Sequence, residues 1–573
     1  MCASKRIFGQ KGMGRNEVSL DAEESEKLIQ QSRVVPVQHA NPFIPAVTWW
    51  YPKWDLAFVA IGATVLSTVF VILMELLHPL IAHSSNVVWI ECLVFLIPWV
   101  AVATAHCNRL FQIYFGAATV LFSVWWWPPV GMIISAPVSV GIGAACTVIA
   151  AVAQHVWAHR MNKAAINNSG LGWVLRFTCM IMLTWYVKYM ICGSNGRLYL
   201  LFSRANFVLQ PISVFGFGSF EFIVTLTNVV LGWWLSVSVQ TRKLLPGSLS
   251  DLSNASTWLR KLRLIITNPI VVLLVLWSLW IISAGIISVA HVPTTSIAVA
   301  TVSLPDKSGK ITDYIVEEFR AGARIVITAP DIYSENRCET KEIVGPSCAE
   351  AIKSDVVPLI ADFGGYTIIG CSSRMIHDGQ CRKKSIAMIA HPNGNITPAV
   401  SFNKENEAEY AIINPSDLEG LGPDKLRFAF VPDFAHEPSD FKKVVFNYGP
   451  NLIFMSGGND YFRTPFVSRL AVDAIENRVA IVRASTHLGS MIVDPVGNVT
   501  ARDGEVQERN PAGGKDSFIF RYRTRGEVTV SDTLAGGWIR QQIPYWFAIL
   551  TYLTYLVYDI IFVIRKRRHD RTN

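Results

Sequence analysis

A series of long apolar stretches constrains this chain more than any other feature of its sequence. A helix needs about 20 mostly apolar residues to cross a bilayer, and stretches of this kind lie near residues 56–80, 86–106, 110–127, 129–157, 171–193, 214–239 and 268–290. Charged residues make up only 16% of the chain, compared with roughly 25% in soluble proteins. The runs are too long and too numerous for the core helices of a soluble protein. We therefore predict a multi-pass α-helical membrane domain of seven spans over residues 51–293.

The sequence changes character after residue 293. Charged residues return, and apolar runs of strand length alternate with helix-like stretches such as 311–321 and 465–477. This alternation predicts an α/β domain over residues 294–535. An eighth and last span is predicted at residues 540–564. Residues 1–50 are predicted to be a disordered cytosolic tail without a cleavable signal peptide, and residues 565–573 a basic cytosolic tail.

The distribution of basic residues predicts the topology. The connections near residues 81–86 and 127–129 contain no Lys or Arg, whereas those predicted inside contain Arg109, Arg160, Lys163, Arg242, Lys243, Arg260, Lys261 and Arg263. Cytoplasmic connections are enriched in these residues. The connection after the fifth predicted span fits this rule less well, because it carries Arg197 and Arg204. Since the basic C-terminal tail is also predicted inside, the α/β domain between spans seven and eight is expected outside.

The formal net charge of +8 does not indicate nucleic-acid binding. The basic residues lie in short runs beside the apolar stretches, where they orient a membrane protein, and do not cover one face. Membrane lipid is therefore a predicted partner, and nucleic acid is not. No metal or cofactor is predicted.

Cysteines and glycosylation sequons also favour an exterior domain. The α/β domain contains four cysteines, Cys338, Cys348, Cys371 and Cys381. In an oxidising compartment they could form two disulfides, in any of three pairings, although four unpaired thiols remain the alternative. The domain also contains sequons at Asn395 and Asn498. These features favour the endoplasmic reticulum or a later secretory membrane, with a bacterial inner membrane as the alternative.

Several short motifs of the α/β domain resemble landmarks of the nitrilase, or carbon–nitrogen hydrolase, superfamily in the right order. They are the segments 319–331, 391–395, 401–404, 427–438, 456–462, 477–489 and 492–498. The series of seven spans, exterior domain and closing span resembles the apolipoprotein N-acyltransferase branch, as does the Gly-rich stretch that runs from Gln210 to Asn228. The resemblance implies a four-layer α-β-β-α sandwich over the membrane. It also implies acyl transfer from a phospholipid to an amine through a cysteine thioester, without a cofactor.

The resemblance assigns three site positions. Lys404 matches the lysine that stabilises the oxyanion, and Asp331 stands where the family has the glutamate that moves the proton. Aspartate is one methylene shorter, roughly 1.5 Å in reach, and a base displaced that far costs on the order of 100-fold in rate. Pro432 occupies the cysteine position and carries no nucleophile. Because no cysteine follows Cys381, a thioester cannot form there.

Ordinary structural roles remain open for these residues. Asp331 could be a strand-end aspartate with local backbone hydrogen bonds, and Lys404 a surface lysine. Replacement nucleophiles are also open, because several polar residues lie near the proline or on the next predicted strand: Asp433, His436, Ser439 and Ser456. The cysteine Cys371 is interpreted as structural or disulfide-bonded.

The sequence leaves three functions open and does not decide whether the chain is an enzyme. The first is a catalytically degenerate relative of the acyltransferases that binds lipid, an acylated substrate or a partner. The second is an active N-acyltransferase or amidase with a rebuilt nucleophile. The third is a transporter or channel, which would leave the large folded domain without a role.

Two acidic residues lie inside predicted spans. Charges in lipid are costly and usually face a partner or a cavity. Glu75 is expected to pair with His78, three residues further along the same helix. Glu221 faces either a cleft below the α/β domain or the membrane interface.

Overall fold

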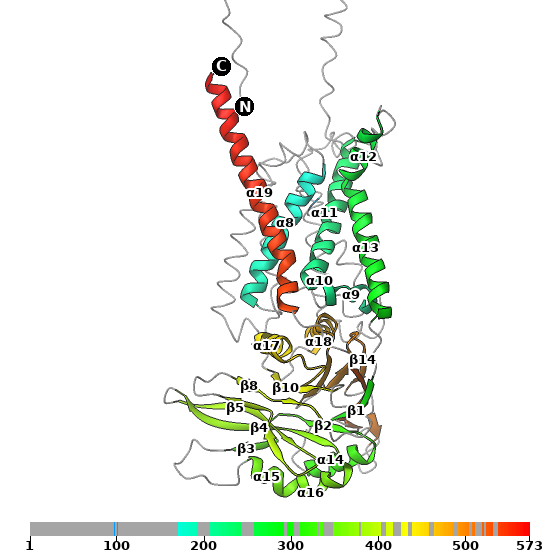
Figure 1. The fold of residues 1–573 in the computed structure, drawn as a ribbon, viewed down its shortest axis with the longest axis vertical. Coiled ribbons are helices and arrows are strands. Elements are labelled where there is room, and N and C mark those ends of the chain that lie inside the picture. The colour runs from blue at the N-terminus through cyan, green and yellow to red at the C-terminus, as the bar shows by residue number, and fades with distance from the viewer. Residues whose placement is uncertain are drawn as a thin grey trace, which may run out of the picture.

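The fold is taken from a computed structural model of the chain (Figure 1). The structure describes residues 97, 100, 170–192, 205–241, 257–290, 295–302, 310–330, 332–335, 348–377, 380–402, 408–415, 426–433, 438–457, 463–485, 490–502, 507–509, 518–520, 523–530 and 537–572. The spans predicted between residues 56 and 157 fall almost entirely outside this set, as does the predicted tail 1–50.

Long helices pack together at one end of the molecule (Figure 1). Within the described residues, α11 (Phe217–Thr241) contacts α8 (Gly170–Cys192), α13 (Pro269–Ala290) and α19 (Gly537–Thr572). These helices occupy the stretches predicted as spans near 171–193, 214–239, 268–290 and 540–564. Shorter helices accompany them: α9 (Asn206–Leu209), α10 (Ile212–Phe215) and α12 (Trp258–Ile266). We refer to this set as the helix bundle.

Two helices of the described chain are long and apolar enough to cross a membrane, by length and composition: Phe217–Leu235 within α11, and α13. A buried core helix of a soluble protein or a signal sequence meets the same criterion. The two helices differ in burial, because 72% of the α11 segment is buried but only 22% of α13. The eight-span membrane domain stays a prediction.

The α/β domain contains two large sheets. The first sheet has the order β17 (Arg523–Val530), β1 (Thr295–Val302), β2 (Ile325–Thr328), β4 (Tyr366–His377), β5 (Gln380–Ala390) and β6 (Ile396–Pro398), with β3 (Tyr333–Glu335) also beside β4. The second sheet has the order β14 (Val499–Arg502), β13 (Met491–Val493), β12 (Ala480–Ser485), β11 (Leu452–Gly457), β10 (Phe428–Asp433) and β9 (Ile412–Ile413). Two small hairpins join β7 (Val400–Phe402) to β8 (Ala408–Tyr410) and β15 (Gln507–Arg509) to β16 (Phe518–Phe520).

The sheets pack face to face and each carries helices on its outer face. Alternate residues of a strand point to opposite faces, so Ile327 of β2 lies in the core between the sheets while Val326 lies in the core beneath the helices. The first sheet is covered by α14 (Ile311–Arg320), α15 (Cys348–Asp355), α16 (Val357–Ile360) and the 3₁₀ turn η4 (Ala361–Phe363), and the second by α17 (Pro438–Tyr448) and α18 (Arg463–Asn477). The predicted four-layer α-β-β-α arrangement is confirmed over the described part of the domain.

The helices of the second sheet lie against the helix bundle (Figure 1). Near the end of α18, a carboxylate oxygen of Glu476 accepts a hydrogen bond from the backbone N–H of Phe217 at 3.0 Å. Phe217 is the first residue of α11, where backbone N–H groups have no partner within the helix. Next to it, Arg478 donates from Nη2 to the hydroxyl of Ser213 at 3.3 Å. Burial lowers the pKa of Arg478 to about 10, against the opposing effect of the Asp494 charge.

A second set of contacts joins α9 to the turn between β13 and β14. Gln210 donates to the carbonyl oxygen of Val496 at 3.1 Å, and Asn206 donates to the side-chain oxygen of Asn498 at 3.0 Å. The turn is held by Asp494, which accepts hydrogen bonds from the backbone N–H groups of Val496 and Asn498. We call these two sets of contacts the domain–bundle joint. Together these contacts join the domain to the bundle, and the hydrogen bonds of Glu476 and Arg478 are buried.

Candidate functional site

The predicted site lies where strands of the two sheets end. In the first sheet, β2 ends at Thr328 and is followed by Ala329 and Pro330, while Asp331 lies outside the described residues. The neighbouring strand β4 approaches this segment closely at Gly370, where an added Cβ would lie 2.4 Å from the carbonyl oxygen of Ala329. Only glycine allows this approach of backbone to backbone.

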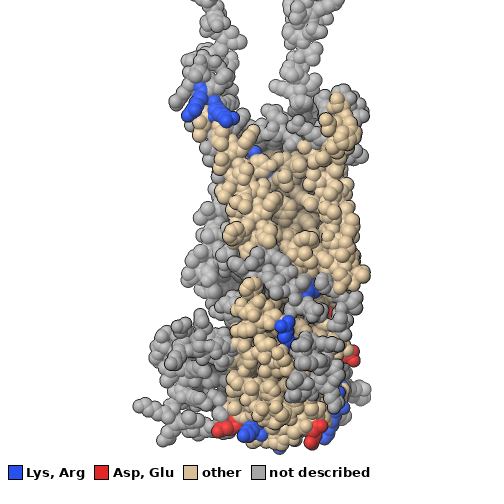
Figure 2. All heavy atoms as spheres, viewed as in Figure 1, with Lys and Arg blue, Asp and Glu red and all other residues tan. Residues whose placement is uncertain are grey.

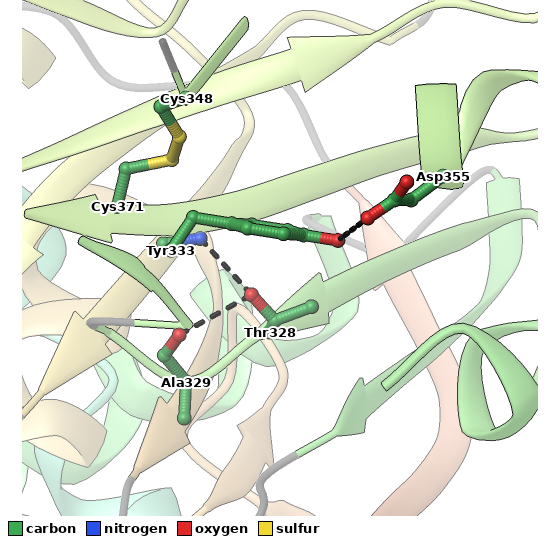
Figure 3. Close-up of a disulfide and its surroundings, with 7 residues drawn as sticks. Thr328, Ala329, Tyr333, Cys348, Asp355 and Cys371 are labelled. Carbon is green, nitrogen blue, oxygen red and sulfur yellow. Dashed lines mark hydrogen bonds between the residues drawn. A yellow bond between two sulfur atoms is a disulfide. The ribbon is translucent and has the colours of Figure 1, made fainter. Parts of the chain in front are cut away.

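Hydrogen bonds hold the same segment from both sides (Figure 3). The hydroxyl of Thr328 accepts a bond from the backbone N–H of Gly370 at 3.0 Å and donates to the carbonyl of Ala329 at 3.2 Å. Beyond the position of Asp331, the backbone N–H of Ile332 donates to the carbonyl of Gly370 at 3.0 Å. Thr328 before Asp331 and Ile332 after it are therefore both hydrogen-bonded to Gly370 of β4.

Strand β3 extends this support to α15. Its residue Tyr333 pairs in register with Cys371, and its hydroxyl donates to the Asp355 carboxylate at 3.4 Å (Figure 3). Burial, followed by the charge and hydrogen bond of Asp355, raises the pKa of Tyr333 from 10.0 to about 12. The raised pKa keeps the hydroxyl protonated and able to donate at pH values at which an ordinary tyrosine ionises.

A disulfide joins α15 to β4 directly. It links Cys348, the first residue of α15, to Cys371, and both are buried (Figure 3). This bond belongs to one of the three pairings that the sequence leaves open. Cys338 lies outside the described residues, and the side chain of Cys381 is not among those described.

In the second sheet, Pro432 is the penultimate residue of β10. It pairs in register with Ser456 of the parallel strand β11, and Asp433 pairs with Gly457. Proline has no N–H for a sheet ladder and is favoured where pairing ends. On its other side, the pairing of β10 with β9 involves only Phe428 and Ala429. The proline thus stands at a strand end, beyond the part of β10 that is paired on both sides.

Ser456 connects the two sheets at this point. Its hydroxyl lies 3.5 Å from the carbonyl oxygen of Thr328, and both residues are buried. The strand that carries Pro432 and the strand that leads to Asp331 are therefore brought together through Ser456.

The remaining predicted positions are placed only in part. Lys404 follows β7 by two residues and lies outside the described residues, as does His436. Ser439 is the second residue of α17. Ser456 is buried, and its hydroxyl donates a hydrogen bond to the backbone carbonyl of Thr328, which cannot act as a general base.

Sequence reasoning missed Thr328, Gly370, Tyr333 and Asp355. A glycine inside an apolar strand run, as at Gly370, often marks a close backbone approach, so that residue had a signal. No local sequence signal marks the Tyr333–Asp355 and Thr328–Ser456 contacts, because they join residues that are distant in the sequence.

Of the two acidic residues predicted inside spans, Glu221 lies in the described part of the chain and Glu75 does not. Glu221 lies near the start of α11, is 2% exposed and accepts a hydrogen bond from the hydroxyl of Tyr545 in α19. Its carboxyl group therefore has a partner inside the bundle. Glu75 and His78 lie outside the described residues.

In the described part of the chain, no group of three or more His, Cys, Asp or Glu residues could hold a metal ion.

No family model matches the chain, and no curated protein matches its sequence. The chain is similar to solved structures of an amidase from Nesterenkonia sp. In one of them the matched region covers 42% of this chain and 90% of the amidase, with 12% sequence identity and a TM-score of 0.27. A cysteine variant of that amidase in complex with butyramide is 14% identical, with 43% and 94% covered and a TM-score of 0.28. A cysteine-to-serine variant, described as an amidase from the nitrilase superfamily, is 12% identical, with 43% and 93% covered and a TM-score of 0.27.

Proposed function

We propose that the chain is a membrane-anchored, nitrilase-like protein that binds lipid, an acylated substrate or an acylated partner without transferring the acyl group. The observation that carries this proposal is Pro432. It is the penultimate residue of β10 and lies beside Ser456, at the position where the apolipoprotein N-acyltransferases that the sequence resembles have their cysteine. Proline offers no atom that can form a thioester. The surrounding architecture is retained while the covalent step is lost.

The exposed apolar surface of the bundle supports a membrane anchor. Side chains of α13 such as Val289 and Ile286 are 78% and 63% exposed. In Figure 2 the face formed by the described helices is almost free of charged side chains, whereas Lys and Arg gather at the far end of α19. A wide uncharged surface of this kind needs an apolar environment. The basic residues at the end of α19 fit the cytoplasmic side of a membrane.

The disulfide between Cys348 and Cys371 supports an exterior domain. Disulfides persist in oxidising compartments and are rare in the cytosol. The α/β domain lies between α13 and α19 in the chain. With the basic C-terminal end of α19 on the cytoplasmic side, both helices join the domain on the opposite side of the membrane. A lumenal position in the secretory pathway fits these features, with the outer face of a bacterial inner membrane as the alternative.

The test uses the purified full chain in lipid nanodiscs, a phospholipid with a radiolabelled acyl chain, and a peptide with a free amino terminus. The expected result is saturable retention of labelled lipid with no label on the peptide and no covalent label on the protein. Lys404→Ala is expected to weaken retention if that lysine faces the bound carbonyl. Transfer of label to the peptide, abolished by Lys404→Ala, would reject the binding-only function.

A second candidate function is acyl transfer with a rebuilt nucleophile. It is favoured by Ser456, a buried hydroxyl beside Pro432 at the same strand end. A serine needs an adjacent base to act as a nucleophile, and the described partner of its hydroxyl is the carbonyl oxygen of Thr328. The same assay distinguishes the two candidates, because only an active enzyme gives an acyl adduct that disappears in Ser456→Ala.

A further inference from the structure

The asparagine side chains of the two sequons in the α/β domain are both exposed, but they differ in the hydrogen bonds that they make. Asn395 closes the tight turn between β5 and β6, in which the N–H of His391 donates to the carbonyl of Asn395 at 2.9 Å. Gly394 takes a φ of +85° in this turn, and the backbone N–H of Asn395 donates to the side chain of Asn393 at 3.0 Å. The fold thus uses only the main chain of Asn395. Its side chain is exposed and makes no hydrogen bond within the described residues.

The turn lies in the part of the domain that faces away from the bundle. A Cβ added to Gly394 would lie 3.6 Å from Val357 of α16, and α16 belongs to the outer layer of the first sheet. The layer that contacts the bundle is formed by α17 and α18 of the second sheet (Figure 1). A large group on Asn395 would extend into solvent without meeting the membrane helices.

Asn498 is engaged in the domain–bundle joint. Its Nδ2 donates to the Asp494 carboxylate at 2.9 Å, and its Oδ1 accepts the hydrogen bond from Asn206 at 3.0 Å. The oxygen end of this amide therefore joins the turn to Asn206 of α9, and the nitrogen end holds the turn itself. A sugar on Nδ2 would replace one of its hydrogens and place a bulky group where the domain meets the bundle.

We propose that Asn395 is a site of N-linked glycosylation and that Asn498 is not. The inference rests on the proposed exterior position of the domain. In the reaction, Nδ2 of Asn395 forms a bond to C1 of the first sugar of a polyprenyl-diphosphate-linked oligosaccharide. The bond between C1 and the diphosphate oxygen breaks, the diphosphate leaves with the electron pair, and the proton lost from Nδ2 passes to the base of the host transferase. Thr397 supplies the hydroxyl that the sequon requires.

The position of Asn395 also gives the glycan a structural consequence. Asn395 directly precedes β6, which is the last strand of the first sheet and pairs only with β5 in the described sheet. Exposed edge strands are templates for aggregation, and proteins protect them with charges, prolines or covering groups. Pro398 at the end of β6 already limits pairing, and a glycan beside Ile396 covers the rest of this edge.

The experiment is translation of the full chain with endoplasmic reticulum microsomes. The wild-type chain is expected to shift by the mass of one glycan, and endoglycosidase treatment should reverse the shift. Asn395→Gln and Thr397→Ala are expected to abolish it. Thr397→Ser retains the sequon and a hydroxyl for the 2.8 Å hydrogen bond with His391, and is expected to keep the shift. Asn498→Gln and Thr500→Ala are the matched controls, and they should leave the shift unchanged.

Protease protection of the α/β domain in sealed microsomes separates failure of this site from failure of the topology. A protected domain with no shift, or a shift that depends on Asn498, overturns the glycosylation site while the exterior topology stands. A domain digested by protease added outside overturns both.

Discussion

The hydroxyl of Ser456 lies 3.5 Å from the carbonyl oxygen of Thr328, joining the end of β11 in one sheet to the end of β2 in the other. These residues are 128 positions apart in the chain. Their contact brings the strand end next to Pro432 close to the segment that leads into Asp331.

Restoring a thiol tests whether the site is an inactivated acyltransferase. In Pro432→Cys, the new side chain should stand where the resembled enzymes have their nucleophile. We expect covalent acyl labelling of residue 432 from the radiolabelled phospholipid, detected by mass spectrometry of the digested protein. Labelling should fall in Pro432→Cys combined with Lys404→Ala, because the oxyanion then lacks its cation.

The matched comparison is Val431→Cys, one residue earlier in β10, where the side chain points to the other face of the strand. It should not be labelled. Labelling at residue 431 but not at residue 432 would contradict the assigned register.

Gly370→Ala should destabilise the α/β domain. The added Cβ would lie 2.4 Å from the carbonyl oxygen of Ala329 and 2.7 Å from Cα of Pro330. Because these are backbone atoms that cannot rotate away, we expect a loss of about 1–3 kcal/mol, measured as a lower denaturation midpoint. Gly285→Ala in α13 is the control, since a Cβ there meets nothing within 4 Å. Equal midpoints for the two variants would contradict the close approach of β4.

Glu476→Ala should loosen the domain–bundle joint. The N–H of Phe217 would lose its carboxylate acceptor in a buried position, which costs about 1–3 kcal/mol. The joint can be followed in Asn206→Cys/Asn498→Cys, because the two native side chains are in hydrogen-bond contact. We expect this pair to form a disulfide readily under mild oxidation, and more slowly when Glu476→Ala is added.

The pair Asn206→Cys/Asn395→Cys is the control for cross-linking, because Asn395 lies in the turn next to α16. It should remain reduced under the same conditions. Efficient cross-linking of this control pair, or no cross-linking of the Asn206→Cys/Asn498→Cys pair, would contradict the contact between α9 and the turn that joins β13 to β14.

The alkaline stability of the domain should depend on Tyr333. Its folded pKa of about 12 lies above the ordinary value of 10.0. Below pH 10 the hydroxyl is protonated in both states, and between pH 10 and 12 only the unfolded state releases the proton. The unfolded state therefore binds fewer protons there, and stability falls as pH rises. Thermal unfolding of Tyr333→Phe from pH 8 to 11.5 should show a smaller alkaline decline than the wild type.

Local sequence patterns predicted the elements of the α/β domain well. The helices expected at 311–321 and 465–477 are α14 (Ile311–Arg320) and α18 (Arg463–Asn477), because their amphipathic periodicity and the turns that bound them are short-range properties. The apolar runs before Ala329 and around Gly370 are β2 and β4. The sandwich follows from strands that are apolar on both faces.

Contacts between distant residues could not be predicted in the same way. Nothing near Thr328 indicates that its carbonyl meets Ser456, and cysteine spacing did not choose Cys371 as the partner of Cys348. The predicted span near 214–239 corresponds to α11 (Phe217–Thr241), but the short helices α9 and α10 before it were not predicted. Their turn at Gly216, with a φ of +76°, depends on packing against the α/β domain.

The hydrogen bond between Tyr545 and Glu221 determines when the bundle can be completed during synthesis. Its two residues are 324 positions apart, and β17, which pairs with β1, is also made late. The ribosome must therefore deliver nearly the whole polypeptide before the acid in α11 meets its tyrosine donor. A chain truncated before α19 would leave that carboxyl without this donor in the interior of an unfinished assembly, a species that quality-control machinery should recognise and degrade.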